Sequence, residues 1–331
     1  MQQLNSKKKR RPFESYAISQ CALFKSSSPK KLCEILHRSE SSINTILADN
    51  KRYREFLAPE EINPFSGKLT KARNVQTPVD TLRGIHERLL KLLERIQHPD
   101  YAHAGVKKRS YRSNALVHQY SRVIATFDLK DFYGSTNSSL VFNFFNDDMK
   151  CAGDVSSLLT KLTTYDGRIP TGSPLSPLLA LHAAKPMFDK LNTLASKFNL
   201  KFTCYVDDLT FSGDKIPSIL LQQVRSIVTR YGYKLSDKKT RIYQEHHKKI
   251  VTGTVIFGKK ITVPNSRFMS ARRLQEAIDG TYDSHGFTEA QLAAKLAGVM
   301  NEASYLDPRF HAKALDARKR LAKVKLIDLE K

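Results

Sequence analysis

Apolar residues recur at helical spacing in several separate stretches of the chain, which predicts a largely helical framework. Residues 28–57 carry a pattern of short amphipathic helices, and residues 81–96 carry that of one strong amphipathic helix. A long apolar helix is predicted at residues 178–198 and an amphipathic one at 219–231. Beyond Pro264 the composition shifts to helix formers with scattered Lys and Arg. We therefore expect a C-terminal helical domain, which closes with a basic amphipathic helix at 314–331.

β-prone runs separate these helices and carry most of the acidic side chains of interest. Residues 122–128 form a largely apolar run that ends in Asp128, which predicts a strand with a carboxylate at its end. Two short runs rich in Thr, Tyr, Val and Phe flank Asp207 and Asp208, so we expect a hairpin with both acids at its turn. A strand pair is predicted at about 250–257 and 260–263.

The charge balance points to a polyanionic partner. The chain has 331 residues, with 55 Lys and Arg against 32 Asp and Glu, which gives a formal net charge of +23. Such an excess favours nucleic acid, because neutralised phosphates release bound counterions. A membrane surface is the competing explanation, but no segment reaches the roughly 18 to 20 apolar residues that a span needs.

The cysteines and the N-terminus add two further expectations. The four cysteines show no C-x-x-C spacing and no histidine partners at metal-ligand distance, so we expect buried thiols in a reducing compartment, the cytoplasm. Residues 1–12 include the basic run 7–11, which no apolar stretch follows. They are interpreted as a disordered basic arm that can touch RNA, and not as a secretory signal.

Three carboxylates stand out as candidate metal ligands. An isolated Asp-Asp pair is most often a solvated turn, because Asp is favoured there. Here Asp128, at a strand end, precedes Asp207 and Asp208 by about 80 residues. Three carboxylates in this arrangement suit two Mg²⁺ ions, which prefer hard oxygen ligands and serve two-metal phosphoryl transfer.

Several short motifs resemble those of reverse transcriptases, in order and spacing, over about residues 60–260. Residues 127–133 (Phe-Asp-Leu-Lys-Asp-Phe-Tyr) look like the first catalytic motif, and residues 205–208 (Tyr-Val-Asp-Asp) look like the Y-x-D-D box. The loop at 170–177 is similar to the P-Q-G-x-x-x-S-P loop, and Lys239-Thr240 resembles the later lysine motif.

Two further motifs narrow the resemblance to bacterial retron reverse transcriptases. Residues 114–118 (Asn-Ala-Leu-Val-His) resemble their N-A-x-x-H motif, and residues 251–253 (Val-Thr-Gly) resemble their V-T-G motif. The compact length favours this family over the group II intron maturases, which usually carry extra domains.

The resemblance implies an α+β, right-hand polymerase fold with fingers, an antiparallel-sheet palm and a helical thumb. Residues 1–58 would form the basic arm and its helices, 59–120 the fingers and 259–331 the thumb. The palm would span 121–258, with an inserted fingers segment at about 134–175.

The resemblance also implies the roles of individual residues. Asp128, Asp207 and Asp208 match the catalytic acids, and together with Leu129 they would form the metal site. Tyr133 matches an aromatic gate against the ribose 2′-OH, with an ordinary core aromatic as the alternative. Lys239 matches a lysine that protonates or neutralises pyrophosphate, with a plain surface lysine as the alternative.

Further residues are expected to bind nucleotide or RNA. The remaining predicted contacts to the incoming nucleotide are Lys68, Arg73, Thr171 and Gly172, and Lys71 can stand in for Lys68 or Arg73. Thr171 departs from the usual Gln of its loop, and Val206 departs from the Ala or Thr frequent in retron enzymes. Asp131 is a secondary structural acid, a nucleotide-contacting acid or a helix cap, and it is not counted among the metal ligands. The predicted RNA contacts are Asn114, His118, Val251, Thr252 and Gly253, with hydrogen bonding inside a loop as the alternative for Asn114 and His118.

The function implied is RNA-directed DNA polymerisation on a cognate structured noncoding RNA. Such an enzyme would use dNTPs and two Mg²⁺ ions, prime from a 2′-OH and leave single-stranded DNA linked to RNA. It would act with an effector protein in antiphage defence, without a membrane partner. The alternatives are another bacterial defence, diversity-generating or group II-like reverse transcriptase, and a non-catalytic RNA-binding scaffold that keeps the fold.

Overall fold

The computed structural model describes residues 14–329, so the predicted basic arm at residues 1–12 lies outside the described residues. Helices are the main regular elements, and in the described chain after Pro264 every regular element is helical, as the composition there predicts. The α-helices are α1 (Pro29–Leu36), α2 (Glu40–Ala48), α3 (Asp80–Leu93), α4 (Tyr111–His118), α5 (Phe132–Ser135), α6 (Ser138–Asn143), α7 (Gly153–Thr163), α8 (Ser176–Ala183), α9 (Lys185–Lys197), α10 (Leu220–Arg230), α11 (Asn265–Ile278), α12 (Glu289–Leu306) and α13 (His311–Leu329).

The strands form small antiparallel sheets. They are β1 (Tyr53–Ala58), β2 (Glu61–Ile62), β3 (Leu69–Thr70), β4 (Arg73–Pro78), β5 (Val123–Asp128), β6 (Lys201–Tyr205), β7 (Asp208–Gly213), β8 (Arg241–Tyr243), β9 (Lys249–Val251), β10 (Thr254–Phe257) and β11 (Lys260–Thr262). The largest sheet has four strands in the order β6-β7-β5-β8, and β9, β10 and β11 form a three-stranded sheet beside it.

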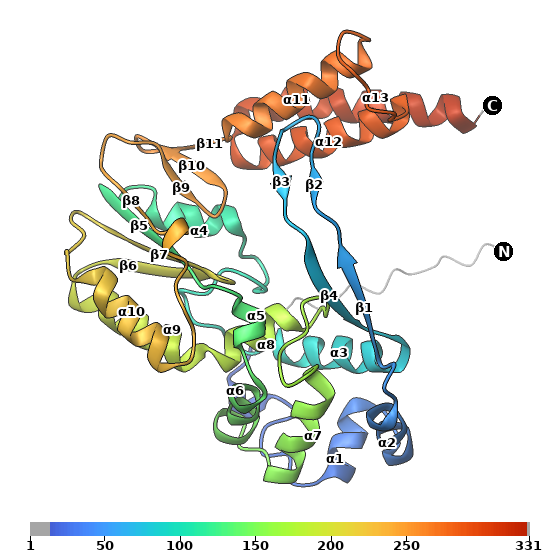
Figure 1. The fold of residues 1–331 in the computed structure, drawn as a ribbon, viewed down its shortest axis with the longest axis vertical. Helices are drawn as coiled ribbons and strands as arrows, with labels where there is room; N and C mark the ends of the chain where they lie inside the picture. The colour runs from blue at the N-terminus through green and yellow to red at the C-terminus, as the bar shows by residue number, and fades with distance from the viewer. Residues whose placement is uncertain (1–13, 330–331) are drawn as a thin grey trace, which may run out of the picture.

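The four-stranded sheet lies between helices (Figure 1). Helix α9 contacts β6 and carries α10, while α4 lies against β6 and β7. Phe127 and Phe211, on the central strands, are almost fully buried, and their rings meet edge to face at 5.7 Å. One continuous apolar core joins this sheet to the N-terminal helices and to α3. The sheet is therefore a rigid base for any side chain at its edge.

Three predicted elements differ from those in the structure. Tyr53 and Phe56, which we assigned to a helix, lie in β1, because β4 supplies an antiparallel partner about 20 residues further on. The predicted helix at 178–198 breaks at Ala184 into α8 and α9, since Pro186 has no N–H and its ring disfavours a continuous helix. The strand predicted at 250–257 is two strands, β9 and β10, joined by a tight turn at Thr252 and Gly253.

The paired strands β1 and β4 continue into the β2–β3 hairpin, which reaches the C-terminal helices (Figure 1). At the tip, Phe65 is only 2% exposed and inserts among aromatic side chains of the C-terminal part. Its ring centroid lies 6.3 Å from Tyr282, 5.6 Å from His285 and 6.0 Å from Phe287. An Arg273 guanidinium N–H donates to the Phe65 carbonyl at 3.2 Å.

The C-terminal helices make a second contact, with α4. The hydroxyls of Ser110 and Tyr305 are 2.6 Å apart, and Tyr111 donates to the Glu302 carboxylate at 3.2 Å. The C-terminal helices therefore contact the rest of the chain in two places, the β2–β3 hairpin that extends from β1 and β4, and helix α4, which lies against the sheet (Figure 1).

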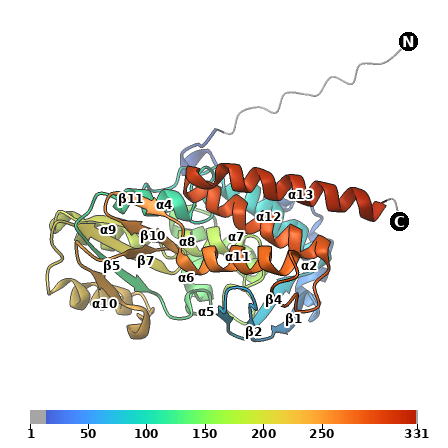
Figure 2. The ribbon, with the colours of Figure 1, turned by 90° about the horizontal axis from the view of Figure 1, so that it is seen from above.

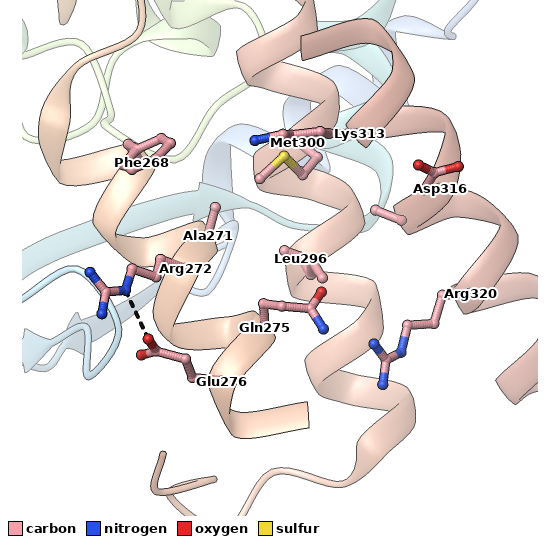
Figure 3. Close-up of a pocket in the computed structure, with 11 residues that line it drawn as sticks. Phe268, Ala271, Arg272, Gln275, Glu276, Leu296, Met300, Lys313, Asp316 and Arg320 are labelled. Atoms are coloured by element: carbon pink, nitrogen blue, oxygen red, sulfur yellow. Dashed lines mark hydrogen bonds and ion pairs between the residues drawn. The ribbon is translucent and has the colours of Figure 1, made fainter. Parts of the chain in front are cut away.

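Helices α11, α12 and α13 lie next to one another across the top of the molecule (Figure 2). Between α11 and α13, over α12, is a groove of about 500 Å³ (Figure 3). Its floor is apolar, with Leu296 and Met300, and its rim carries both charges, including an Arg272–Glu276 ion pair of 2.8 Å.

The described part of the chain also bears on the expectations about thiols and membranes. All four cysteines are free and buried, as predicted. In residues 14–329 no helix combines the length and the apolar character that crossing a bilayer requires.

Candidate active site

The central sheet brings the three predicted catalytic acids to one edge. Asp128 is the last residue of β5 and Asp208 the first of β7, and the two are directly opposite each other in the antiparallel register. Side chains at opposed positions lie on the same face, with Cβ atoms about 5 Å apart. Asp207 immediately precedes Asp208, and its carbonyl accepts a hydrogen bond of 2.9 Å from the Leu129 N–H.

The turn that carries Asp207 is one residue earlier than predicted. Its two loop residues are Val206 and Asp207, while Asp208 already pairs with Tyr205 across β6 and β7. Val206 has a φ of 57°, a conformation that a β-branched residue adopts at a cost of about 1–3 kcal/mol. Such a backbone persists only where the surroundings impose it, and here the paired strands on both sides do so.

Burial and the neighbouring carboxylates raise the pKa values of Asp207 and Asp208. Burial, and then the charges of Asp207 and Asp128, raise the pKa of Asp208 to about 7. Burial is also the largest cause that raises the pKa of Asp207. Asp128 is only 7% exposed, and its Oδ2 lies 2.6 Å from the Lys239 Nζ. Lys239 is thus a close positive charge, and its hydrogen bond to Asp128 raises the pKa of the ammonium.

The donor set fits a hard divalent cation. Three formal negative charges face the single ammonium of Lys239, and like charges this close are stable together only with further positive charge. Carboxylate oxygens are the ligands that Mg²⁺ prefers. Within the described residues no group of three or more His, Cys, Asp or Glu side chains is placed to hold a metal ion, and the Asp128 carboxylate accepts a hydrogen bond from Lys239.

A pocket of about 550 Å³ opens beside these acids and gathers most of the predicted nucleotide-binding residues. The side chains and backbone that line it are Arg73, Asn74, Val75, Asp128, Leu129, Lys130, Asp131, Phe132, Tyr133, Thr171, Gly172, Val206, Asp207, Ser236 and Lys239. Lys68 does not line it, because it lies at the tip of the β2–β3 hairpin, where its carbonyl accepts from the Asn63 N–H at 3.0 Å. Sequence reasoning missed Asn74, Lys130 and Ser236, which are near neighbours of predicted residues and carry no signal of their own.

The loop at residues 170–177 is held against β4. The Thr171 hydroxyl donates to the Asn74 carbonyl at 3.1 Å, and the Gly172 N–H donates to the Gln76 carbonyl at 3.0 Å. A Cβ at Gly172 would collide with the Thr77 hydroxyl and would lie 2.8 Å from the Gln76 carbonyl oxygen. Glycine is therefore required here by the close approach of two backbones.

His86, which the sequence did not single out, holds the same loop through a hydrogen bond to Ser173. This buried side chain of α3 has its Nε2 2.8 Å from the Leu162 carbonyl oxygen, so Nε2 carries the proton. Nδ1 then accepts from the Ser173 hydroxyl at 2.6 Å. Burial lowers the pKa of His86 to about 4, which keeps the ring neutral in this role. A lone histidine on an apolar helix face gives no sequence signal for such a contact.

Tyr133 stands at the wall of the pocket, as a gate residue would. Its side chain is half-buried, and burial, followed by the charge of Asp207, raises its pKa to about 12. Asp131, two residues earlier, occupies the N-cap position of α5 with a φ of 47°, but its side chain makes no capping hydrogen bond. The capping alternative for Asp131 is thus not what the structure shows.

The two motifs predicted to bind RNA lie together and mostly inside the fold. Asn114 and His118 are in α4, not in a loop, and both are fully buried. The His118 ring is 2.6 Å from the Ser212 hydroxyl and 2.7 Å from that of Thr203. Because neither side chain reaches the surface, the prediction that they contact RNA directly is wrong for this structure.

The V-T-G motif packs on the same helix. Val251 is fully buried in a cluster with Ala115, so it is also no RNA contact. Thr252 and Gly253 form the turn between β9 and β10, both with positive φ, and only Gly adopts this freely. The Thr252 hydroxyl donates to the Tyr111 carbonyl at 3.1 Å. The two motifs therefore meet in space, and only the half-buried Thr252 and the exposed Gly253 are available to a ligand.

Comparisons with known proteins agree with this arrangement. A family model described as "Reverse transcriptase (RNA-dependent DNA polymerase)" matches residues 66–256, more than half of the chain. The retron Se72 reverse transcriptase of Salmonella heidelberg is 27% identical over 276 residues, which cover 78% of this chain and 70% of that protein. The retron Ec86 reverse transcriptase of Escherichia coli is 26% identical over 224 residues, 67% of this chain and 68% of that protein.

A third relative extends the match to another organism. The retron Mx162 reverse transcriptase of Myxococcus xanthus is 26% identical over 269 residues, 71% of this chain and 55% of that protein. The matched region includes the acids of β5 and β7, the loop at 170–177 and Lys239. The chain therefore belongs to the reverse transcriptase family, and it is an RNA-directed DNA polymerase of the retron type.

Proposed function

We propose that this enzyme copies part of its own structured noncoding RNA into single-stranded DNA that stays linked to the RNA. The observation that carries the proposal is the meeting of Asp128, Asp207 and Asp208 at one sheet edge, beside a pocket large enough for a nucleotide. The relatives' description as retron enzymes supports the choice of RNA. The net charge of +23 supports a polyanionic substrate.

The parts of a right hand are assigned on the same basis. The sheet β6-β7-β5-β8 would be the palm, within residues 121–258, and the inserted segment at 134–175 would return to the fingers. The fingers would span 59–120 and include the β1–β4 strands. Residues 259–331, with α11, α12 and α13, would form the thumb.

The chemistry would be nucleotidyl transfer with Asp128, Asp207, Asp208 and the Leu129 backbone holding two Mg²⁺ ions. When bound, the metal ions would activate the attacking hydroxyl and stabilise the pyrophosphate that leaves. Lys239, now paired with Asp128, would neutralise charge on the leaving group when the metal ions take over the carboxylate. Its exposed side chain, 63% accessible, is free to make that exchange.

Positioning of the dNTP would fall to the other wall of the pocket. Arg73 is an exposed guanidinium suited to triphosphate oxygens. The backbone around Thr171 and Gly172, fixed to β4, would shape the floor under the base pair. The ring of Tyr133 would exclude a ribose 2′-OH by its bulk. Lys68 would act on nucleic acid near the thumb and not on the triphosphate, since it lies at the hairpin tip.

The wider role is proposed from the retron relationship. The enzyme would prime from a 2′-OH of its RNA, keep the RNA–DNA product bound, and act with an effector protein in antiphage defence. We place it in the cytoplasm, where dNTPs and the noncoding RNA are available.

One assay tests the proposal and separates it from its alternatives. Purified protein, the RNA encoded next to its gene, dNTPs and Mg²⁺ should yield DNA that shortens when the RNA is digested and the branch is cleaved. Asp207→Asn with Asp208→Asn should abolish the product, while the exposed Asp214→Asn should not.

Each other outcome has a definite meaning. DNA without an RNA linkage would favour another class of bacterial reverse transcriptase. No DNA from the wild type, with RNA binding intact, would favour the scaffold alternative.

A further inference from the structure

A second pocket lies at the opposite end of β5 from the catalytic acids. Its volume is about 310 Å³, and it is lined by Gln119, Tyr120, Ser121, Arg122, Glu245, His246, Lys249, Phe257, Gly258 and Lys259. Arg122 directly precedes β5, whose other end is Asp128. A strand of this length spans roughly 20 Å, so the pocket is separate from the nucleotide pocket.

Its most unusual member is a buried lysine. Lys249 is only 2% exposed, and its ammonium donates to one acceptor among the described residues, the Glu245 carbonyl at 2.8 Å. An ammonium carries three N–H donors, and a buried charge is costly unless it is paired. The Glu245 carboxylate is already bound to Arg122, at 2.8 Å and 3.0 Å. The geometry thus leaves Lys249 with donors to spare on the wall of a pocket.

The other charges of the pocket point the same way. Arg122 and Lys259 add two exposed positive charges, and Glu245 is the one acid of the lining. Lys248, beside the pocket, lies with its ammonium 5.9 Å from the centroid of the Phe257 ring. The surplus of positive charge around an ammonium that donates only to the Glu245 carbonyl among the described residues suits an anion.

Two exposed aromatic rings complete the site. Phe257 is 53% exposed and Tyr120 is 67% exposed, and both line the pocket. The walls that carry them are tied together, because the Gln119 side chain donates to the Lys259 carbonyl at 2.6 Å. Rings of this kind offer stacking surfaces to bases that are not paired, while neighbouring cations track the phosphates.

We infer that this pocket binds an unpaired nucleotide of the RNA substrate, outside the catalytic centre. Lys249, Arg122 and Lys259 would take the phosphate, and Phe257 or Tyr120 would stack on the base. The inference rests on the proposed use of RNA as substrate. The site would hold a single-stranded segment of the RNA while another part is copied about 20 Å away.

The test measures binding of a single-stranded RNA oligonucleotide, oligo(U), by fluorescence anisotropy over a range of salt concentrations. Phe257→Ala should weaken binding about tenfold, within the range of one lost base stack. Lys249→Met removes the charge with little change in volume, so the variant should fold. It should lower the slope of log affinity against log salt by about 0.7, the value for one phosphate on a single strand.

Two exposed residues serve as matched controls, Lys30→Met for the charge and Ile219→Ala for the apolar side chain. Both should bind like the wild type. Oligo(U) with 4-thiouridine should crosslink to Phe257 or Tyr120 in the wild type, and Lys249→Met should reduce the yield.

Three results would overturn the inference: unchanged affinity and slope in both pocket variants, crosslinks that all lie elsewhere, or equal retention of an acidic peptide such as oligoglutamate. Extension of a preformed poly(rA)·oligo(dT) duplex should stay at the wild-type rate in the pocket variants. A failure of extension in the wild type would count against the proposed polymerase, whereas a failure of oligo(U) binding alone counts against this pocket.

Discussion

Replacing Phe65 with alanine should release the β2–β3 hairpin from the C-terminal helices. Phe65 is 2% exposed, and its ring meets those of Tyr282, His285 and Phe287. A buried Phe→Ala change costs about 3–5 kcal/mol in a protein core. Because the Phe65 ring joins the β2–β3 hairpin to the C-terminal helices, most of this free energy is lost from the contact between these two elements. The open state should gain population by about a hundredfold or more.

The hairpin itself should survive the change. The Asn63 carboxamide accepts from the N–H groups of Phe65 and Ser66, at 3.1 Å and 2.9 Å, and these bonds involve no Phe65 side-chain atom. The Arg273 guanidinium donates to the backbone carbonyl of Phe65, so this hydrogen bond can still form in the variant. The variant should thus lose the contact between the β2–β3 hairpin and the C-terminal helices, while both elements stay folded.

Hydrogen exchange and primer extension together measure the effect. In Phe65→Ala, the turn keeps its hydrogen bonds but loses the cover of the C-terminal helices, so the amides of residues 63–68 should exchange faster. Extension in the presence of a trap should give shorter products. Addition of the first nucleotide should keep its rate, because the acids of β5 and β7 are untouched. Phe65→Leu should behave nearly as wild type, as should Leu69→Ala, which changes a 45% exposed residue of the same hairpin. Unchanged protection at residues 63–68 in Phe65→Ala would refute the reasoning.

Three other variants test the nucleotide pocket and the buried His118. Gly172→Ala should raise the KM for dNTP by about tenfold or more, because the new Cβ collides with β4. The control is Gly298→Ala, where a Cβ meets nothing within 4 Å, and it should only stabilise helix α12. An unchanged KM would show that the loop yields easily. Lys239→Met should lower kcat about a hundredfold by removing the positive charge at Asp128, and the neighbouring exposed Lys238→Met should not. Full activity of Lys239→Met would show that Lys239 is a plain surface lysine with no part in catalysis. Burial holds the pKa of His118 at about 3, below its ordinary 6.5, so its contribution to stability is complete above pH 6.5 and is lost as the pH falls toward 3. The urea concentration at the unfolding midpoint should therefore decrease as the pH is lowered from 6.5. In His118→Gln this decrease should be less steep. Equal dependence of the midpoint on pH in the two proteins would contradict the reasoning.

The catalytic edge could be predicted because its information is local. Asp128 closes an apolar strand run, and Asp208 opens another, so any antiparallel pairing of the two strands brings the acids together. The prediction erred by one residue at the turn, where Val206 takes a positive φ that its side chain disfavours. Only the pairing of β7 with both β5 and β6 imposes that register.

What the sequence could not reveal depends on contacts between distant segments. Tyr53 and Phe56 fit a helical pattern, and they became a strand because β4 pairs with them. Phe65 is one aromatic residue in a turn, and its burial depends on helices more than 200 residues away. His86 and Ser173 meet across 87 positions, with no motif to announce them.

Asn114 and His118 illustrate a different limit. Their spacing with the V-T-G motif is a true signal, since α4 packs directly on the β9–β10 turn. The signal reports packing, however, while RNA contact needs exposed atoms. Burial was the missing quantity, and spacing along the chain does not contain it.

Nucleotide addition by Asp128, Asp207 and Asp208 is the proposal on which the others depend. It is tested most directly by the rate of single dTTP addition to poly(rA)·oligo(dT) with Mg²⁺, by wild type and Asp208→Asn, at equal folded fraction. We expect a fall of about a thousandfold or more in the variant, since a carboxamide neither bears the charge nor serves as a comparable ligand. A rate within tenfold of the wild type would contradict it.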